Sequence, residues 1–160
     1  MRVVCDTSPL ILLAKIDRLE LLFRLYRQTA IPISVLDEVR VGPTEETTAI
    51  ESLVENKALK IQRVSPEVLE SVPANLGAGE REAIALAIET DANMVVLDDR
   101  EGRRVARERD LSVTGTIGIL IEARAREMIA SVRGEMDRLI EAGMWIDEAF
   151  YHRILQEFDE

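Results

Sequence analysis

MRVVCDTSPLILLAKI, residues 1–16, is the stretch of sequence that decides the fold. It begins with a short apolar run, residues 3–5, in which no polar residue alternates with the apolar ones. Such a run is typical of a strand that is buried on both faces of a parallel sheet. The run stops at Asp6, so the carboxylate of Asp6 is predicted at the C-terminal end of a strand. In an open parallel α/β sheet, ligands bind at that edge.

A helix is predicted directly after Asp6. Ser8 can accept hydrogen bonds from the free N–H groups of a first helical turn, and Pro9 suits the first helical position. Residues 10–16 then place apolar side chains at helical spacing. Asp6 is therefore expected between a strand end and a helix N-terminus.

The rest of the chain repeats this alternation of strand and helix. Short apolar or β-prone segments predict further strands at 29–31, 59–64, 94–97 and 111–113, with helical patterns between them. Such alternation implies crossover units and a parallel sheet. We predict an α/β fold with three α/β/α layers around a twisted parallel sheet of four or five strands. A core of residues 1–126 is followed by a helical C-terminal tail, residues 127–160.

Length and composition indicate one globular domain over residues 1–160. The chain is 47% apolar and 31% charged, which is ordinary for a domain large enough to bury a core. No run approaches the roughly 18 apolar residues of a membrane span, and the N-terminus does not resemble a signal peptide. Cys5 is the single cysteine, which excludes a disulfide framework and a cysteine-based zinc site. We expect a cytoplasmic protein with no membrane contact.

Acidic residues recur where this fold would bring them together. They are Asp6 after the first strand, Asp98 and Asp99 after the strand at 94–97, and the helix-borne Glu38 and Glu80. Each close pair of carboxylates would cost roughly 4 kcal/mol at about 4 Å and an effective dielectric near 20. A hard divalent cation with oxygen ligands relieves that repulsion, and Mg²⁺ or Mn²⁺ is the natural match. Such an ion can activate a water and neutralise charge that develops on a phosphodiester.

Each acid also has a purely structural explanation. Asp6 could form an Asx turn, and Asp98 or Asp99 could cap the helix that follows at 100–109. Glu80 lies in the first turn of a helix, where a carboxylate complements the helix dipole, and so does its competitor Glu82. Convergence of several acids on one edge is what favours the metal site.

The charge pattern leaves the question of a nucleic-acid partner open. A net charge of −10 argues against a sequence-independent nucleic-acid binder. Arginines nevertheless crowd residues 100–109, and Arg100, Arg103 and Arg104 are candidate RNA contacts because arginine binds phosphate in a bidentate manner. The alternative is that these arginines form an ordinary solvated surface.

Other chemistries find little support. His152 is the only histidine and lies in a late helical pattern, so it favours a surface role over catalysis. Cys5 lies inside the first strand and reads as a core residue. Residues 77–79 lack the spacing of a dinucleotide-binding loop. Trp145, Phe150 and Tyr151 are most simply packing residues of the last helix, and they could lie at a dimer contact.

Taken together, the ordered motifs resemble the PIN domain, a Mg²⁺-dependent nuclease fold that includes the VapC-type toxins of prokaryotic toxin–antitoxin pairs. The motifs are VVCDTSPLILLAKI at 3–16, IPISVLDEV at 31–39, LGAGEREAIALA at 76–87, VVLDDREGRRVA at 95–106 and VTGTIGIL at 113–120. The resemblance covers nearly the whole chain, including the helical tail.

The resemblance implies a set of site residues. The four acids of the family match Asp6, Glu38, Glu80 and Asp99, with Asp98 either sharing the metal or capping a helix. The family more often has aspartate at the third position, and Glu82 offers a rival register there. Hydroxyl side chains expected to support the site are Thr7, Ser8 and Thr114.

The resemblance also implies a function, namely Mg²⁺- or Mn²⁺-dependent endonucleolytic cleavage of RNA. Toxin members of the family are typically homodimers that an antitoxin neutralises, and the acidic charge of this chain would suit such a partner. A catalytically inactive PIN-like module that binds nucleic acid or protein is the alternative. A phosphoryl-accepting receiver domain is disfavoured, because the paired acids come late and no lysine follows Lys60.

Overall fold

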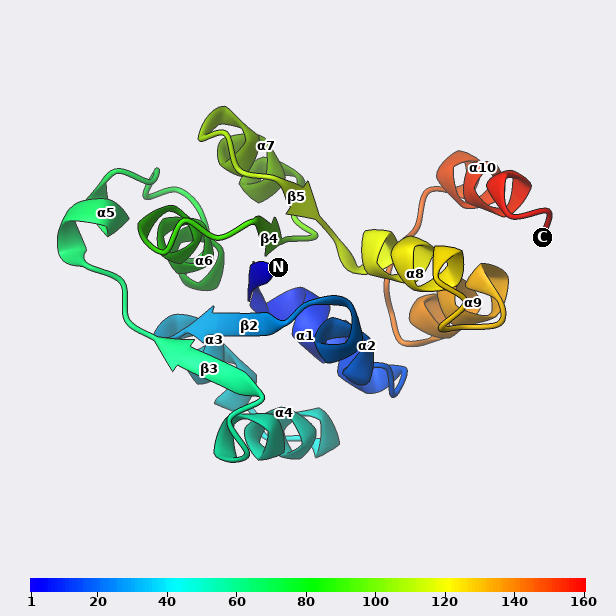
Figure 1. The fold of residues 1–160 in the computed structure, drawn as a ribbon, viewed down its shortest axis with the longest axis horizontal. Coiled ribbons are helices and arrows are strands. Elements are labelled where there is room, and N and C mark those ends of the chain that lie inside the picture. The colour runs from blue at the N-terminus through cyan, green and yellow to red at the C-terminus, as the bar shows by residue number, and fades with distance from the viewer.

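Five short strands form one all-parallel sheet in the order β3-β2-β1-β4-β5 (Figure 1). The computed structural model describes residues 1–160. The strands are β1 (Arg2–Cys5), β2 (Gln28–Pro32), β3 (Leu59–Gln62), β4 (Met94–Val96) and β5 (Val113–Thr114). The predicted parallel sheet is therefore confirmed with five strands, and the segment at 59–64 is an edge strand.

Ten helices connect and follow the strands. They are α1 (Thr7–Lys15), α2 (Glu20–Leu25), α3 (Ile33–Arg40), α4 (Glu45–Glu55), α5 (Pro66–Glu70), α6 (Ala78–Glu89), α7 (Arg100–Glu108), α8 (Thr116–Ala125), α9 (Val132–Glu141) and α10 (Glu148–Glu157). Two expectations about α1 are wrong: the helix already begins at Thr7, so Ser8 does not cap it and Pro9 is its third residue. Pro9 is tolerated there because N–H groups in the first turn have no partner within the helix.

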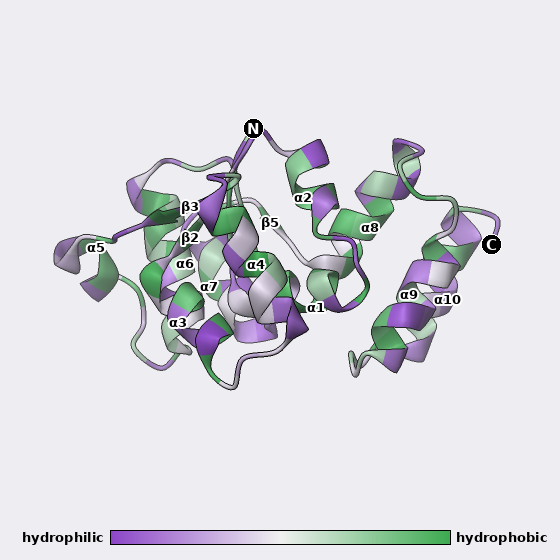
Figure 2. Cartoon of the chain, turned by 90° about the horizontal axis from the view of Figure 1, so that it is seen from below, coloured by the Kyte–Doolittle hydropathy of each residue, from purple (hydrophilic) through white to green (hydrophobic).

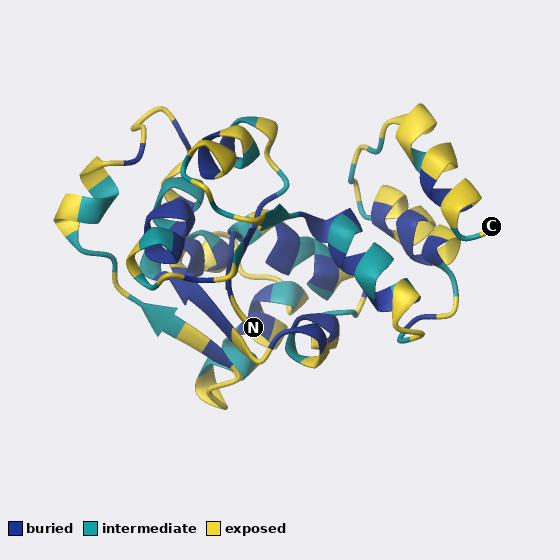
Figure 3. Ribbon diagram, turned by 45° about the horizontal axis from the view of Figure 1, so that its top comes forward, coloured by how far each residue is buried: buried dark blue, intermediate teal, exposed yellow.

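Alternate residues of the strands point to opposite faces of the sheet and build two apolar clusters. Val3, Cys5 and Val96 belong to a larger cluster with residues of α1, α2 and α8. Val4 and Val95 belong to a smaller cluster with residues of α6 and α7. In Figure 3 the central strands are largely buried, whereas the edge strand β3 is mostly intermediate or exposed. The sheet is thus covered on both faces, as the α/β/α prediction requires.

The order of the strands reverses in the middle of the sheet. From β1 the chain adds β2 and β3 on one side, then crosses back to add β4 and β5 on the other. The Asp6 amide donates a hydrogen bond to the Val96 carbonyl at 3.0 Å, so the two central strands end side by side. Such a reversal point is where open α/β sheets bind ligands, at the carboxyl ends of the strands.

The helical tail packs against α8 rather than against the sheet. Met136, Leu139 and Leu155 of α9 and α10 are buried in the larger cluster. The buried Glu135 accepts hydrogen bonds from Arg18 at 2.7 and 3.0 Å, which joins α9 to the segment after α1. Figure 2 shows α9 and α10 lying side by side beyond α8. None of the ten helices has the length and apolar character needed to cross a membrane.

We predict that the tail contributes to global stability through Leu139. Leu139 is 0% exposed, so Leu139→Ala is expected to lower the free energy of unfolding by about 2–5 kcal/mol, in one transition. The matched control is Ile140→Ala on the same helix, where 45% exposure limits the expected loss to about 0.5 kcal/mol. Denaturant unfolding followed by circular dichroism measures both. A second, independent transition for the tail would contradict the prediction.

Candidate functional site

Five carboxylates from separate elements surround the carboxyl ends of β1 and β4. Two adjoining cavities share Asp6 and Glu80; one also includes Glu38, and the other includes Asp98 and Asp99. We call this region the acidic cleft and define it by these five residues. As the sequence predicts, acids that are far apart in the chain lie together over one edge of the sheet.

Asp6 and Glu38 approach each other at the N-terminus of α6. Thr7 Oγ1 donates a hydrogen bond to Glu38 Oε2, and the Gly79 amide donates to Glu38 Oε1 at 2.9 Å. A Cβ on Gly79 would lie 2.6 Å from Glu38 Oε2 and 3.0 Å from Asp6 Oδ1. Only a residue without a side chain allows both carboxylates this close to the helix.

Asp6 contains the one carboxylate oxygen of the chain that is buried without a partner. Asp6 is 5% exposed, and its Oδ1 accepts no hydrogen bond. Burial raises the pKa of Asp6 to about 6, opposed by a hydrogen bond from the Thr7 amide and reinforced by the charges of Glu38, Asp98 and Asp99. A buried oxygen without a donor is costly in a protein and favourable next to a cation.

Glu80 and Asp99 face each other on the other side of Asp6. The Gly102 amide donates to Asp99 Oδ2 at 2.9 Å, so Asp99 caps α7. Burial, the charges of Asp99 and Asp6, a hydrogen bond with Asp99 and the charge of Glu38 raise the pKa of Glu80 to about 7. Glu82, the rival in sequence, lies in neither cavity.

Asp98 caps a different helix. Its Oδ1 accepts a hydrogen bond from the Thr116 amide at 2.7 Å, and its Oδ2 accepts one from Thr116 Oγ1 at 2.6 Å. Capping of the helix at 100–109 therefore holds for Asp99 alongside its position in the cleft, whereas Asp98 binds the N-terminus of α8 instead. Sequence reasoning missed Thr116, because its contact with Asp98 joins residues that are 18 positions apart in the chain.

The three hydroxyl residues predicted to support the site occupy different places. Thr7 holds Glu38, and the exposed Ser8 lines both cavities of the cleft. Thr114 lines a neighbouring cavity, together with Asp98, and the threonine that contacts a cleft carboxylate from this region is Thr116.

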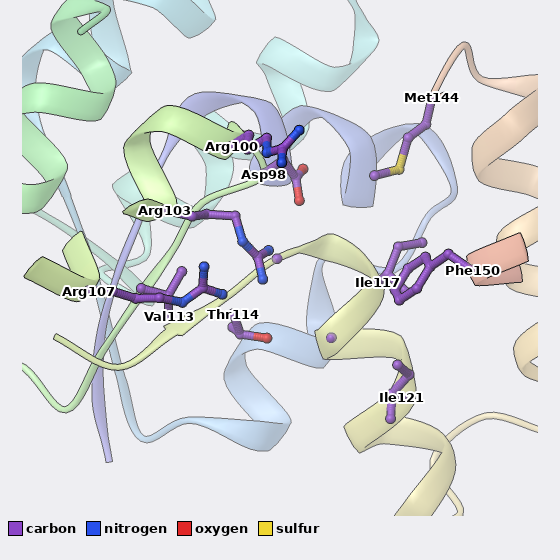
Figure 4. A pocket seen from close by; sticks show the side chains of 12 residues that line it. Asp98, Arg100, Arg103, Arg107, Val113, Thr114, Ile117, Ile121, Met144 and Phe150 are labelled. Carbon is purple, nitrogen blue, oxygen red and sulfur yellow. The ribbon is translucent and has the colours of Figure 1, made fainter. Parts of the chain in front are cut away.

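The candidate arginines divide into two groups. Arg104 forms ion pairs with Glu101 and Glu108 on the outer face of α7. Arg100 and Arg103 instead line the cavity next to Asp98, as does Arg107, which the sequence analysis did not single out (Figure 4). The structure thus pairs Arg104 with glutamates of its own helix, whereas the other three line the cavity next to Asp98.

Trp145 does not pack as the sequence analysis expected. It lies in the loop between α9 and α10, is 81% exposed and lines the acidic cleft beside Asp6, Glu80 and Asp99. The expectation of packing with the last helix was wrong for Trp145, because Trp145 precedes α10 rather than lying on its apolar face. Phe150 is also 38% exposed, and Tyr151 donates a hydrogen bond to Asp137.

The donor set of the cleft fits a hard divalent cation. No three His, Cys, Asp or Glu side chains have the spacing of a complete protein-made metal site. Mg²⁺ does not need one, because it usually keeps several waters and binds one or two carboxylates directly. Asp6 and Glu38 supply such a pair, and the partnerless Asp6 Oδ1 is the atom that a cation would stabilise most.

The comparisons with known proteins agree with the fold. A family model described as a PIN domain matches residues 2–160. A PilT N-terminus domain protein from the hyperthermophilic archaeon Sulfolobus solfataricus P2 has a similar solved structure, with a TM-score of 0.57 and 18% identity. The similarity covers 77% of this chain and 93% of that chain, and at this identity it concerns the fold alone. No curated protein matches the chain.

We predict that the protein without added metal becomes less stable as pH rises. The folded-state pKa values of Asp6 and Glu80 lie at about 6 and about 7, above their ordinary values of 3.8 and 4.5. The folded state therefore binds more protons than the unfolded state in this range, and its stability falls from about pH 4 to about pH 7.

Thermal unfolding in a chelator between about pH 5 and about pH 8 measures the effect, with an expected loss of a few degrees in Tm. Asp6→Asn removes one of the two groups and is expected to flatten the profile, while Asp37→Asn, at an exposed position on α3, keeps the wild-type profile. An Asp6→Asn profile as steep as the wild type contradicts the assignment.

Proposed function

This chain belongs to the PIN-domain family, and from that premise we propose that it is an endoribonuclease that depends on Mg²⁺ or Mn²⁺ bound in the acidic cleft. The fold of the family is a nuclease-type fold. Asp6, Glu38, Glu80 and Asp99 are the proposed catalytic and metal-holding residues, and Asp98 supports them from the edge of the cleft.

One observation supports the proposal more than any other. Asp6 Oδ1 is buried, has no hydrogen-bond donor and faces the carboxylate of Glu38 across Gly79. A core stabilised only by packing would not retain two carboxylates in this arrangement, because neither neutralises the other. A site that functions by holding a cation requires such an arrangement.

The residues of the cleft have distinct proposed roles. A divalent cation, when bound, would supply the positive charge that stabilises a scissile phosphate and activates a water. Asp6 and Glu38 would hold it, with Glu38 kept in position by Thr7 and the Gly79 amide. Glu80 and Asp99 would orient the water on the opposite side, where they face each other.

The biological setting is proposed on the same basis. An RNA substrate and a neutralising antitoxin are the proposed partners, and the toxin of a toxin–antitoxin pair acting as a homodimer is the proposed role. The cleft of five carboxylates would complement basic side chains of an antitoxin. An inactive module that binds nucleic acid or protein without cutting it is the competing function, and the next experiment separates the two.

We predict that the purified protein cleaves single-stranded RNA in Mg²⁺ or Mn²⁺ and that a chelator stops cleavage. Asp6→Asn is expected to lower the rate by more than about 100-fold, beyond the typical effect of losing a residue that only supports a metal ligand. Asp37→Asn, which removes an exposed carboxylate next to Glu38 in the chain, is the matched control and should cleave at the wild-type rate. Wild-type cleavage by a folded Asp6→Asn protein contradicts the site, and binding of RNA without cleavage supports the inactive module.

A second prediction tests the register of the third acid. Glu80→Gln is expected to lower the rate about 10- to 100-fold, because Glu80 lines both cavities of the cleft. Glu82→Gln, two residues along the same helix, should stay within about twofold of the wild type, since surface changes of this kind have small effects. Initial rates on a fluorogenic RNA at saturating Mg²⁺ give both values. A larger loss of rate in Glu82→Gln than in Glu80→Gln would assign the role to Glu82.

A further inference from the structure

We propose that the arginine-lined cavity next to the acidic cleft is a subsite for one nucleotide of a single-stranded RNA. Its arginines would contact the phosphate, and its apolar wall would contact the base. This inference rests on the proposed function, because it names where the substrate strand continues beyond the cleavage site.

The cavity adjoins the cleft along the same edge of the sheet. It has a volume of about 490 Å³, within the roughly 300–1,000 Å³ of pockets that hold small organic ligands. Asp98 and Met144 line both this cavity and the acidic cleft, so the two are continuous. A single-stranded RNA with its scissile phosphate in the cleft would therefore place a neighbouring nucleotide in the cavity.

One wall of the cavity is cationic. Arg100, Arg103 and Arg107 are spaced three and four residues apart on α7, which places them on one helical face (Figure 4). None of the three forms an ion pair, whereas Arg104 on the same helix is paired with two glutamates. No carboxylate forms an ion pair with these three guanidinium groups, so they are available to an anionic ligand that enters the cavity.

Gly115 leaves the space that the side chains of Arg103 and Asp98 need at this wall. A Cβ at Gly115 would lie 2.6 Å from Arg103 Nη1 and 2.7 Å from Asp98 Oδ1. A hydrogen bond also holds Arg103 in place, since its Nη1 donates to the Leu97 carbonyl at 3.2 Å. The Leu97 carbonyl, just after β4, and the absence of a side chain at Gly115 thus position the guanidinium of Arg103 in the cavity, next to Asp98 but not paired with it.

The opposite wall is apolar. Ile117 and Ile121 of α8, Met144 of the α9–α10 loop and Phe150 of α10 line it. Phe150 is 38% exposed, and the guanidinium of Arg153 lies 5.6 Å from the centre of its ring. Proteins bind the unstacked bases of single-stranded RNA with aromatic side chains and arginine planes of this kind.

The combination of the two walls favours a nucleotide over other anions. A free phosphate would not need the apolar wall, and an apolar ligand would not need three arginines. A nucleotide has a phosphate and a flat base in one unit, which matches both. An acidic segment of a protein partner is the competing occupant, and unchanged RNA binding in the variants below would point to it.

The test measures binding of a fluorescein-labelled single-stranded RNA to the Asp6→Asn protein in Mg²⁺ by fluorescence anisotropy. Arg107→Ala and Phe150→Ala, each added to Asp6→Asn, are expected to weaken binding about 10-fold. Arg107→Ala should also reduce the slope of log Kd against log salt by about one, while Phe150→Ala leaves the slope unchanged. Arg104→Ala on the same helix is the matched control and should bind within about twofold of its parent.

An RNA with one abasic residue supplies a second measurement. Losing the base should cost the same affinity as Phe150→Ala, and the two losses should not add, because both remove one contact. In the cleavage-competent chain, Arg107→Ala and Phe150→Ala should raise KM with little change in kcat. Unchanged Kd and KM in both variants, or an equal loss in Arg104→Ala, overturns the subsite.

The two proposals fail in different ways. Cleavage with an unchanged KM in both variants contradicts the subsite and supports the proposed nuclease activity. RNA binding that depends on Arg107 and Phe150, without any cleavage by the wild-type chain, removes the nuclease and leaves the subsite. Thermal unfolding of each variant confirms that the fold is retained.

Discussion

The pairing of β1 with β4 is the constraint on which the rest of the structure depends. These two strands come from opposite ends of the core in sequence, and their parallel register places Cys5 opposite Val96. Asp6 and the Asp98-Asp99 pair follow immediately, so the acids meet because the strands that precede them are neighbours. The reversal of strand order at this point prevents a crossover helix from covering the gap, which leaves the edge open to a ligand.

Most of the fold could be predicted from the sequence, because its local patterns agree with its tertiary structure. The apolar run that ends at Asp6 and the run that ends at Asp98 both mark buried strands, and helical periodicity marks each crossover. The parallel order of five strands then follows from the alternation. The details that failed concern side-chain direction. Trp145 was expected to pack with the last helix, but it lies between the turn at residues 142–143 and α10, where it is exposed.

The candidate site was predictable to the level of which acids meet, but not how each is held. The hydrogen bond from the Gly79 amide to Glu38 joins α6 to α3, and the pair of hydrogen bonds from Thr116 to Asp98 depends on β5 lying beside β4. No local pattern contains these relations, since each needs the sheet in place. The pairing of Arg104 could have been found, because glutamates three residues before it and four after it are favourable helical partners.

Electrostatics explains why so many carboxylates can share one edge and why they still favour a cation. Four helices begin at this edge and direct backbone N–H groups at the acids. The α1 amide of Thr7 contacts Asp6, and amides in the first turns of α6, α7 and α8 contact Glu38, Asp99 and Asp98.

Each helix N-terminus stabilises a carboxylate by about 0.3–1 kcal/mol, and up to about 2 kcal/mol when partly buried. A close carboxylate pair costs about 4 kcal/mol at an effective dielectric of 20, so helix dipoles alone do not offset five acids. The repulsion that is not offset favours proton binding, which is seen in the raised pKa values of Asp6 and Glu80. Asp6 also keeps one oxygen, Oδ1, without any hydrogen-bond donor. A divalent cation competes with those protons for the same oxygens. Protonation of Asp6 and Glu80 and binding of the ion are therefore alternative ways to reduce the repulsion between the carboxylates.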